Sequence, residues 1–256
     1  MTILKAMAVA ISMYSRIPVP RVEWEEKNMK YAMGFFPAVG VFIGAAEFLA
    51  GSLILEYTTA GALLFAAVMT LIPAAVTGGI HLDGFADTVD ALSSHKDRES
   101  RLAIMEDPHT GAFAVIGLCC YFLAVFALLS EIPGKEDPRR ILILTALIFP
   151  VSRALSGIAA VSFPPAKKRG LLRTFQEKAQ KGTVRLILAV WLLLGAAGMI
   201  LADWRQGCMM LALAGAVYVY YYGLCRRQFG GTTGDLAGYF LQLCELAMLA
   251  GAVLTG

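Results

Sequence analysis

Three aspartates, Asp83, Asp87 and Asp90, are spaced four and three residues apart directly after a long uncharged stretch of the chain. On a helix, positions i, i+4 and i+7 share one face, so this spacing predicts three carboxylates along one side of a helix. Three like charges on neighbouring turns repel one another unless a cation lies between them. Carboxylate oxygens suit Mg²⁺ or Mn²⁺, and Mg²⁺ is usually completed by waters and substrate phosphates. We therefore predict that these aspartates bind Mg²⁺, with Asp83 and Asp87 also serving as catalytic residues.

The surrounding residues, 78–92, read GGIHLDGFADTVDAL, and His81 within them is a candidate substrate-binding residue. In the alternative interpretation, the acids form only a solvated first turn of a cytoplasmic helix, where negative charge favours the helix dipole. Apolar residues on the other faces of this helix, such as Phe85 and Val89, indicate that it is packed and not freely solvated. This favours the metal site.

A second candidate is the segment 230–235, Gly-Gly-Thr-Thr-Gly-Asp, which opens the last apolar segment. Glycines let the backbone approach a ligand closely, and a helix N-terminus offers unpaired N–H groups to phosphate oxygens. We take Gly231, Thr233 and Gly234 as candidate substrate-binding residues and Asp235 as a candidate catalytic residue. The alternative is a glycine-rich turn that only caps the helix.

Charged residues inside apolar segments form a third group. They are costly there and normally face a protein interior or a polar cavity. Glu245 lies in the last apolar segment and is a candidate catalytic residue, while Arg153 lies in the segment 140–162. Arg153 could pair with Glu245 or Glu47, or it could bind a substrate phosphate, and the sequence leaves both readings open.

Two loops add further candidates. The segment 163–185 carries seven Lys and Arg residues, among them Arg169, which we take as a candidate phosphate-binding residue. A bias of positive charge toward the cytoplasmic side would explain the same residues. Asp107, in the segment 81–110, is a further substrate-binding candidate.

The elements that must position these residues are membrane spans. The chain has 256 residues, 58% of them hydrophobic and 16% charged, which is outside the range of soluble domains. About 20 apolar helical residues cross a hydrocarbon core. We predict an all-α, polytopic transmembrane bundle of about seven spans, forming a single domain over residues 1–256, with a short, retained N-terminal helix at 3–14. The predicted spans are 31–55, 57–80, 111–130, 140–162, 186–202, 207–224 and 236–255.

The basic residues predict the orientation of the bundle. Alternating the predicted spans puts 16 Lys and Arg residues in the loops on one side and four on the other. Because Lys and Arg accumulate in cytoplasmic loops, the aspartates are expected to face the cytoplasm. Carboxylates suited to Mg²⁺, a glycine-rich helix start and basic loops on one side together indicate phosphoryl transfer, in which the protein mainly supplies positioning.

These motifs resemble the cobalamin synthase family, also called adenosylcobinamide-GDP ribazoletransferases. The resemblance extends over nearly the whole chain. The matching segments are YSRIPVP at 14–20, PAVG at 37–40, the aspartate block at 78–92, MEDPHTGAF at 105–113, GTTGD at 231–235 and Glu245. The combination of an HxDGxxDxxD block with a downstream GGxTGD block is specific. Glu106 and Gln242 depart from the family pattern, which often has Lys and Glu at these positions.

The resemblance implies a Mg²⁺-dependent transferase. A ribose hydroxyl of alpha-ribazole, or of its 5′-phosphate, would attack the corrinoid-side phosphorus of adenosylcobinamide-GDP, giving adenosylcobalamin or its 5′-phosphate and releasing GMP. Asp235 and Glu245 would contribute metal ligands or a general base. The protein would lie in the lipid bilayer of a prokaryotic inner membrane and would bind no nucleic acid, while assembly into a homo-oligomer stays open.

Two rival functions also fit parts of the pattern. A CDP-alcohol phosphotransferase-like enzyme, or another membrane phosphoalcohol transferase, would use similar chemistry, but the DGxxAR core of the former is absent because Asp87 follows Phe85 and Ala86. A transporter would explain spans with buried charges. The acids concentrate at one rim, however, and no inverted repeat is visible.

Overall fold

The protein is helical throughout the part that the computed structural model describes, residues 2–20, 26–167 and 171–255. Within these residues there is no strand, and a single isolated bridge joins Pro165 to Thr232. The predicted all-α class is confirmed. The α-helices are α1 (Thr2–Tyr14), α2 (Glu26–Ala32), α3 (Phe36–Tyr57), α4 (Ala62–Thr77), α5 (Ile80–Ser93), α6 (Arg98–Ile104), α7 (Ala112–Ser130), α8 (Pro138–Ser162), α9 (Leu171–Lys178), α10 (Lys181–Ala202), α11 (Trp204–Leu224) and α12 (Gly234–Leu254). Short helical turns occupy η1 (Met33–Phe35), η2 (Ile132–Gly134) and η3 (Cys225–Phe229).

Among the described residues, six helical segments are long and apolar enough to cross a membrane, and the bent pair α4 and α5 makes a seventh if it counts as one span. The short N-terminal helix is present as α1. The prediction of about seven spans with a short N-terminal helix is therefore confirmed. The six segments are Met29–Tyr57, Ala112–Gly134, Pro138–Ser162, Lys181–Ala202, Trp204–Phe229 and Gly234–Leu254.

The predicted span 57–80 differs from the structure. Helix α4 ends at Thr77, and the chain turns by 96° into α5. Two glycines make the turn, since Gly78 and Gly79 have φ of 69° and 82°, a left-handed conformation that other residues rarely adopt. The 16 residues of α4 extend only about 24 Å at 1.5 Å per residue, short of a full hydrocarbon core. The turn redirects the aspartate-bearing helix toward α12.

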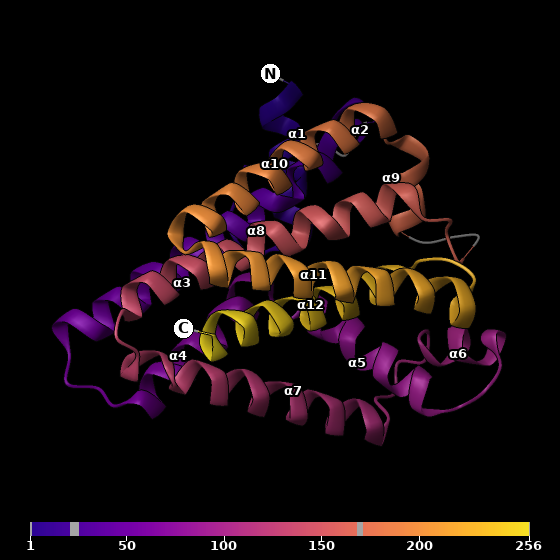
Figure 1. The fold of residues 1–256 in the computed structure, drawn as a ribbon. Helices are drawn as coiled ribbons and strands as arrows, with labels where there is room; N and C mark the ends of the chain where they lie inside the picture. The colour runs from indigo at the N-terminus through magenta and orange to yellow at the C-terminus, as the bar shows by residue number, and fades with distance from the viewer. Residues whose placement is uncertain (1, 21–25, 168–170, 256) are drawn as a thin grey trace.

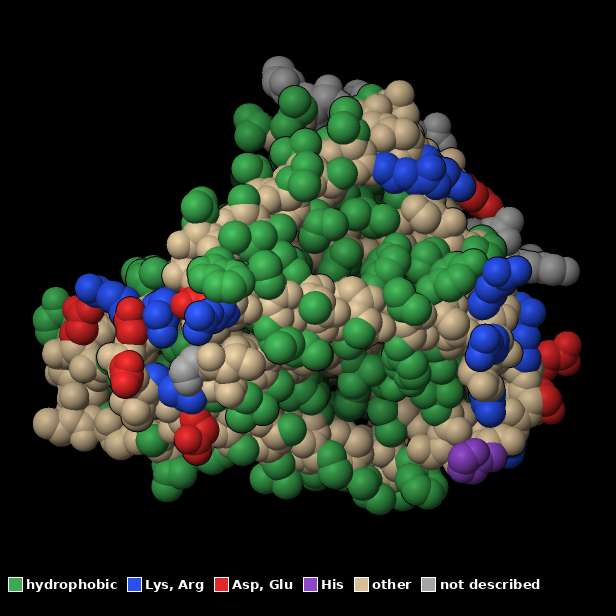
Figure 2. All heavy atoms as spheres, in the orientation of Figure 1, with side chains coloured by type: hydrophobic (Ala, Val, Ile, Leu, Met, Phe, Trp, Pro, Cys, Tyr) green, Lys and Arg blue, Asp and Glu red, His purple; other side chains and the backbone are tan. Residues whose placement is uncertain are grey.

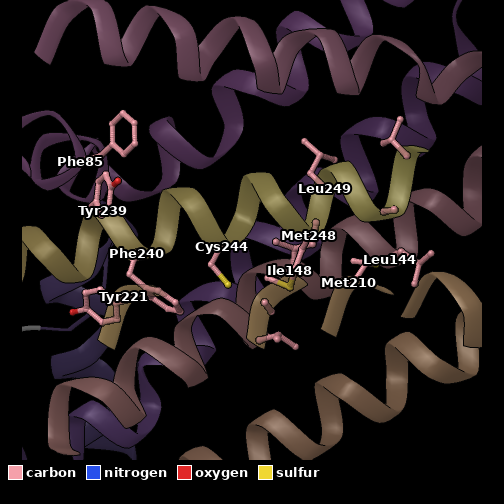
Figure 3. Packing of buried hydrophobic residues seen from close by; sticks show 14 of the residues in the cluster. Phe85, Leu144, Ile148, Met210, Tyr221, Tyr239, Phe240, Cys244, Met248 and Leu249 are labelled. Atoms are coloured by element: carbon pink, nitrogen blue, oxygen red, sulfur yellow. The ribbon is translucent and has the colours of Figure 1, made fainter. Parts of the chain in front are cut away.

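Helices α8 and α12 form the centre of the bundle. In each of them 72% of the most apolar stretch is buried, against 11% in α7 and 22% in α10. Figure 1 shows α7 and α10 on opposite sides of these two helices. Along α12, Phe240, Cys244 and Met248 point toward α8 and α11, where they meet residues such as Ile148 and Tyr221 (Figure 3).

The outer surface fits a lipid environment. Leucines on the peripheral helices are largely exposed, for example Leu123 on α7 and Leu193 on α10. In Figure 2, apolar side chains cover the middle of the visible face, and charged side chains gather at its two ends. Apolar side chains between two charged rims are what a bilayer requires of a multi-pass membrane protein.

Candidate active site

The aspartate-bearing helix α5 crosses the start of α12 at two glycines. A Cβ at Gly84 would lie 2.7 Å from the Cα of Asp235, and a Cβ at Gly238 would lie 2.7 Å from the carbonyl oxygen of His81. Both contacts involve backbone, so a larger residue would push the two helices apart. Small residues permit this kind of close helix crossing in membranes. The crossing brings a carboxylate from α12 to the acidic face of α5.

Asp83, Asp87 and Asp235 form the acidic cluster that results. Asp87 interacts electrostatically with both Asp83 and Asp235, and Asp235 interacts with Asp83. The i, i+4 spacing therefore brings Asp83 and Asp87 together, as predicted from the sequence. No group of three His, Cys, Asp or Glu side chains in the described residues is arranged to hold a metal ion alone. An ion bound at this cluster would need waters or substrate oxygens as further ligands, which is usual for Mg²⁺.

Asp90 lies further along α5. A rise of 1.5 Å per residue separates it from Asp83 by roughly 10 Å along the helix axis, too far for both to bind one ion. Its carboxylate packs against Gly111 at the start of α7, where an added Cβ would overlap it. Asp90 still interacts electrostatically with Asp87, so it adds negative charge to the cluster.

The glycine-rich segment before α12 is held against the loop that follows α8. The backbone N–H of Thr232 donates to the Pro164 carbonyl at 2.8 Å, and the N–H of Ala166 donates to the Thr232 carbonyl at 2.9 Å. A Cβ at Gly231 would lie 2.5 Å from the Pro164 oxygen, so this glycine is required for the backbone contact. Thr233 caps α12, because its hydroxyl accepts the N–H of Leu236 at 3.1 Å. Gly231 and Thr233 thus have structural roles in the turn and the helix cap, which is the alternative to substrate binding given in the sequence analysis.

Lys167 is the basic residue that this contact brings to the cluster. Its Nζ lies 3.1 Å from Oε1 of Glu106 and 3.9 Å from Oδ2 of Asp235, and it also interacts electrostatically with Asp87. Sequence reasoning chose Arg169 from this loop, which lies outside the described residues. Lys167 was missed because composition does not rank the residues within a basic run, although Lys167 is the first basic residue after Pro164 and Pro165.

A cavity of about 320 Å³ opens beside the cluster. Its lining contains both polar and apolar residues. The polar group includes His81, Asp83, Lys167, Thr232, Thr233, Gly234 and Asp235, and the apolar group includes Met13, Tyr14, Met33, Phe36, Leu172 and Leu241. Of the residues that the structure describes, none lies within 4 Å of a Cβ built at Gly234, so the backbone at the start of α12 is open to them at this position.

His81 lines the cavity next to two of its aromatic residues. It is buried, and its ring lies 6.1 Å from that of Tyr14 and 5.7 Å from that of Phe36, centroid to centroid. Neither ring nitrogen has a hydrogen-bond partner within the part of the chain that the structure covers. A buried polar group without a partner is costly, so His81 is suited to bind a ligand in the cavity.

The other predicted site residues lie elsewhere. Arg153 and Glu245 form a buried ion pair, with Arg153 Nη1 2.6 Å from Glu245 Oε1, and neither lines this cavity. Asp107 is exposed in the loop after α6. The backbone N–H and the ring of His109 hold the pKa of Asp107 below its usual range. The ion pair with Glu245 agrees with one of the two roles that the sequence left open for Arg153, pairing with a buried glutamate.

A substitution at the helix crossing tests the geometry of the cluster. Gly84→Val is expected to lower catalytic efficiency about 10²-fold, because separating α5 from α12 by an ångström misplaces the carboxylates. Gly215→Ala on α11 is the control, since nothing lies within 4 Å of a Cβ there. Turnover of the purified, monodisperse variants measures the effect. Unchanged turnover in Gly84→Val would contradict the importance of this crossing.

Comparison with known proteins shows the family of the chain. The profile of the cobalamin-5-phosphate synthase family matches residues 6–253. The chain is 44% identical to the adenosylcobinamide-GDP ribazoletransferase of Lachnoclostridium phytofermentans over 95% of this chain and 91% of that protein. Proteins of the same name from Clostridium perfringens and Desulfitobacterium hafniense are 31% and 32% identical, over 94% and 97% of this chain and 94% and 96% of their own lengths. A search of solved structures found no significant match. A family match over nearly the whole chain, together with these relatives, shows that the chain belongs to the cobalamin-5-phosphate synthase family.

Proposed function

We propose that this protein joins adenosylcobinamide-GDP to alpha-ribazole or its 5′-phosphate. In this reaction a ribose hydroxyl attacks the phosphorus on the corrinoid side of the pyrophosphate, a new P–O bond forms, and the bond to the GMP oxygen breaks. The hydroxyl proton passes to a general base. The observation that carries the proposal is the meeting of Asp83, Asp235 and Lys167 at one cavity, with Asp87 within electrostatic range of all three, in a chain of this family.

The acidic cluster fits a divalent cation. Its donors are carboxylate oxygens, which Mg²⁺ prefers, and Asp83, Asp87 and Asp235 together bring more negative charge than Lys167 neutralises. We assign Asp83 and Asp87 as ligands, with Asp90 adding charge nearby. When bound, Mg²⁺ would offset the charge that develops on the phosphate oxygens.

Lys167 and the start of α12 are suited to hold the pyrophosphate. The ammonium group of Lys167 reaches the same cavity as the first residues of α12, where the positive end of the helix dipole lies. Because the side-chain position at Gly234 is open, phosphate oxygens can approach this backbone. A cation and a helix N-terminus acting on one phosphate stabilise the charge of the transition state.

Asp235 is the residue we assign as general base. It lies in the cavity beside Lys167, within electrostatic range of Asp83, so a hydroxyl bound near the metal would be close to its carboxylate. Glu245, the other candidate, is bound to Arg153 in the bundle interior. A base must reach the proton that it removes, and Asp235 meets that condition better.

The size of the cavity limits which parts of the two substrates can enter it. Ligand cavities for small molecules measure about 300–1,000 Å³, so 320 Å³ accommodates one small substrate. The flat aromatic base of alpha-ribazole suits the apolar part of the lining that includes Tyr14 and Phe36. The corrin ring is too large to enter, so the corrinoid substrate would insert only its phosphate end. In this proposal the cavity opens to the cytoplasmic side of the inner membrane, because the loops on that side carry most of the Lys and Arg residues.

The assay that tests the proposal uses purified protein in liposomes, supplied with adenosylcobinamide-GDP and alpha-ribazole phosphate. GMP and a corrinoid product should form together and only when Mg²⁺ is present. Release of a different nucleotide from another substrate would indicate a different phosphoalcohol transferase. Accumulation of an unaltered substrate inside the liposomes, without GMP, would indicate transport.

Replacing Lys167 tests its role. Lys167→Met is expected to reduce kcat/KM for adenosylcobinamide-GDP about 10- to 100-fold, since a charged hydrogen bond to phosphate contributes about 1.5–3 kcal/mol. Steady-state kinetics against each substrate gives the result, and the efficiency toward free alpha-ribazole should change less. Lys181→Met, an exposed residue at the start of α10, is the matched control. Equal kinetics in all three proteins would exclude a phosphate-binding role for Lys167.

A further inference from the structure

A second, smaller cavity lies inside the bundle, and we refer to it as the inner cavity. It measures about 40 Å³ and is lined by residues of α3, α4, α5, α7, α8 and α12. The inner cavity shares no lining residue with the larger cavity, among the residues described for each. Its polar lining consists of Glu47, Thr70, Tyr121, Thr145, Gln242 and Glu245.

Several of these polar groups have no hydrogen-bond partner among the described residues. Glu47 is 3% exposed and Gln242 is 6% exposed, and no hydrogen bond between described residues involves either side chain. The hydroxyl oxygen of Thr70 is also buried without a partner in the same described part of the chain. Buried polar groups are normally hydrogen-bonded to protein or to a bound species. Unpaired oxygens from three helices around one small space therefore indicate an occupant.

The charges around the inner cavity do not balance. Glu245 has a partner, because Arg153 Nη1 lies 2.6 Å from Oε1 and the Ser152 hydroxyl donates to the same oxygen at 2.9 Å. Glu47 is a second carboxylate within electrostatic range of Glu245, and Arg153 is a single cation. Two ionised carboxylates with one guanidinium would leave one negative charge inside a membrane bundle. Such a charge is costly unless a positive charge neutralises it.

We propose that the inner cavity holds one small monovalent cation, either a sodium ion or a proton carried by water or by Glu47. The available ligands are oxygens of a carboxylate, an amide and hydroxyl groups, which suit a hard cation. A water molecule occupies about 30 Å³ in the liquid, so the space accepts one ion or water with little else. Mg²⁺ is excluded because it keeps several waters of its own.

The site is separate from the proposed transferase chemistry and depends on different residues. Of the groups that face Glu47 from the helices lining the cavity, three can carry charge: Tyr121 from α7, Arg153 from α8 and Glu245 from α12. The hydroxyl of Thr70 is the single polar side-chain group that α4 contributes to the lining, among the described residues. Replacing Glu47 with glutamine keeps the shape and removes the charge, so it should remove the need for the cation.

The test measures thermal unfolding of the full chain in detergent, in sodium chloride and in N-methylglucamine chloride of equal ionic strength, at about pH 6 and pH 8. If sodium is the occupant, it should raise the Tm of the wild type by roughly 3–8 °C at saturation. Glu47→Gln should lose this response. Glu131→Gln, an exposed acid at the end of α7, is the control and should retain it.

If a proton is the occupant, sodium should have no effect, and the wild type should lose stability relative to Glu47→Gln as the pH rises. Equal responses to sodium and pH in wild type, Glu47→Gln and Glu131→Gln would overturn the proposal. Should Glu47→Gln fail to fold, Gln242→Leu takes its place, because it removes an oxygen ligand without changing charge. Gln242→Leu should weaken the response that the wild type shows, and an unchanged response would again overturn the proposal.

Discussion

Replacing Asp87 with asparagine is expected to lower kcat/KM for GMP release by about 10³-fold or more, since loss of a charge that stabilises the transition state commonly costs 10²–10³. Asp87 is at the centre of the acidic cluster, within electrostatic range of Asp83, Asp90 and Asp235. Asparagine keeps the size of the side chain but removes one negative charge and one anionic ligand. The remaining activity should require a higher Mg²⁺ concentration, which a titration of rate against Mg²⁺ measures.

The control for this substitution is Asp97→Asn. Asp97 is an exposed acid that caps α6, where its carboxylate accepts the N–H of Ser100. Asparagine is also a good N-cap, so the helix should be retained. The activity and Mg²⁺ dependence of Asp97→Asn should match those of the wild type. If Asp87→Asn behaves in the same way as this control, the metal assignment is wrong.

Arg153→Met is expected to destabilise the protein by about 3–5 kcal/mol, the usual effect of removing one partner of a buried ion pair. The guanidinium is 1% exposed and is bound to Glu245 and to the Phe149 carbonyl. Without it, the Glu245 carboxylate is left uncompensated within the bundle. Thermal unfolding in detergent, followed by the amount of monodisperse protein after heating, measures the loss.

A double variant separates a structural role from a catalytic one. Arg153→Met with Glu245→Leu removes both charges, so it should recover much of the stability that Arg153→Met loses, because an apolar pair can replace a buried ion pair. If the pair is structural, the folded double variant should also retain turnover. A stable double variant without turnover would instead return Glu245 or Arg153 to the list of catalytic candidates.

The fold was largely predictable because membrane spans are set by local hydropathy. The apolar segments matched the helices, and the short helix before residue 14 is present as α1. The turn at Gly78 and Gly79 was not predicted. Glycines permit a left-handed turn without requiring it, and an uncharged sequence continues across this point. The bend depends on where α5 packs, a long-range contact that no local pattern contains.

The site was predictable where residues share a helix. The spacing brought Asp83 and Asp87 together, and the start of α12 lies beside them. Residues from distant segments could not be placed in this way. Lys167 approaches Asp235 only because the loop after α8 pairs with the turn before α12, and Arg153 meets Glu245 across two packed helices. From the sequence, Glu245 was one of two possible partners for Arg153, and Lys167 was not distinguished from the other basic residues of its loop.

We propose that the protein transfers the corrinoid-side phosphoryl group of adenosylcobinamide-GDP to a ribose hydroxyl. Substrate labelled with ³²P at the corrinoid-side phosphorus tests this transfer most directly. With alpha-ribazole phosphate and Mg²⁺, the purified protein should form a labelled corrinoid product that contains the ribazole, together with unlabelled GMP. Label retained in a corrinoid phosphate, with GMP attached to the ribazole, would contradict the account, as would the absence of Mg²⁺-dependent turnover by folded protein.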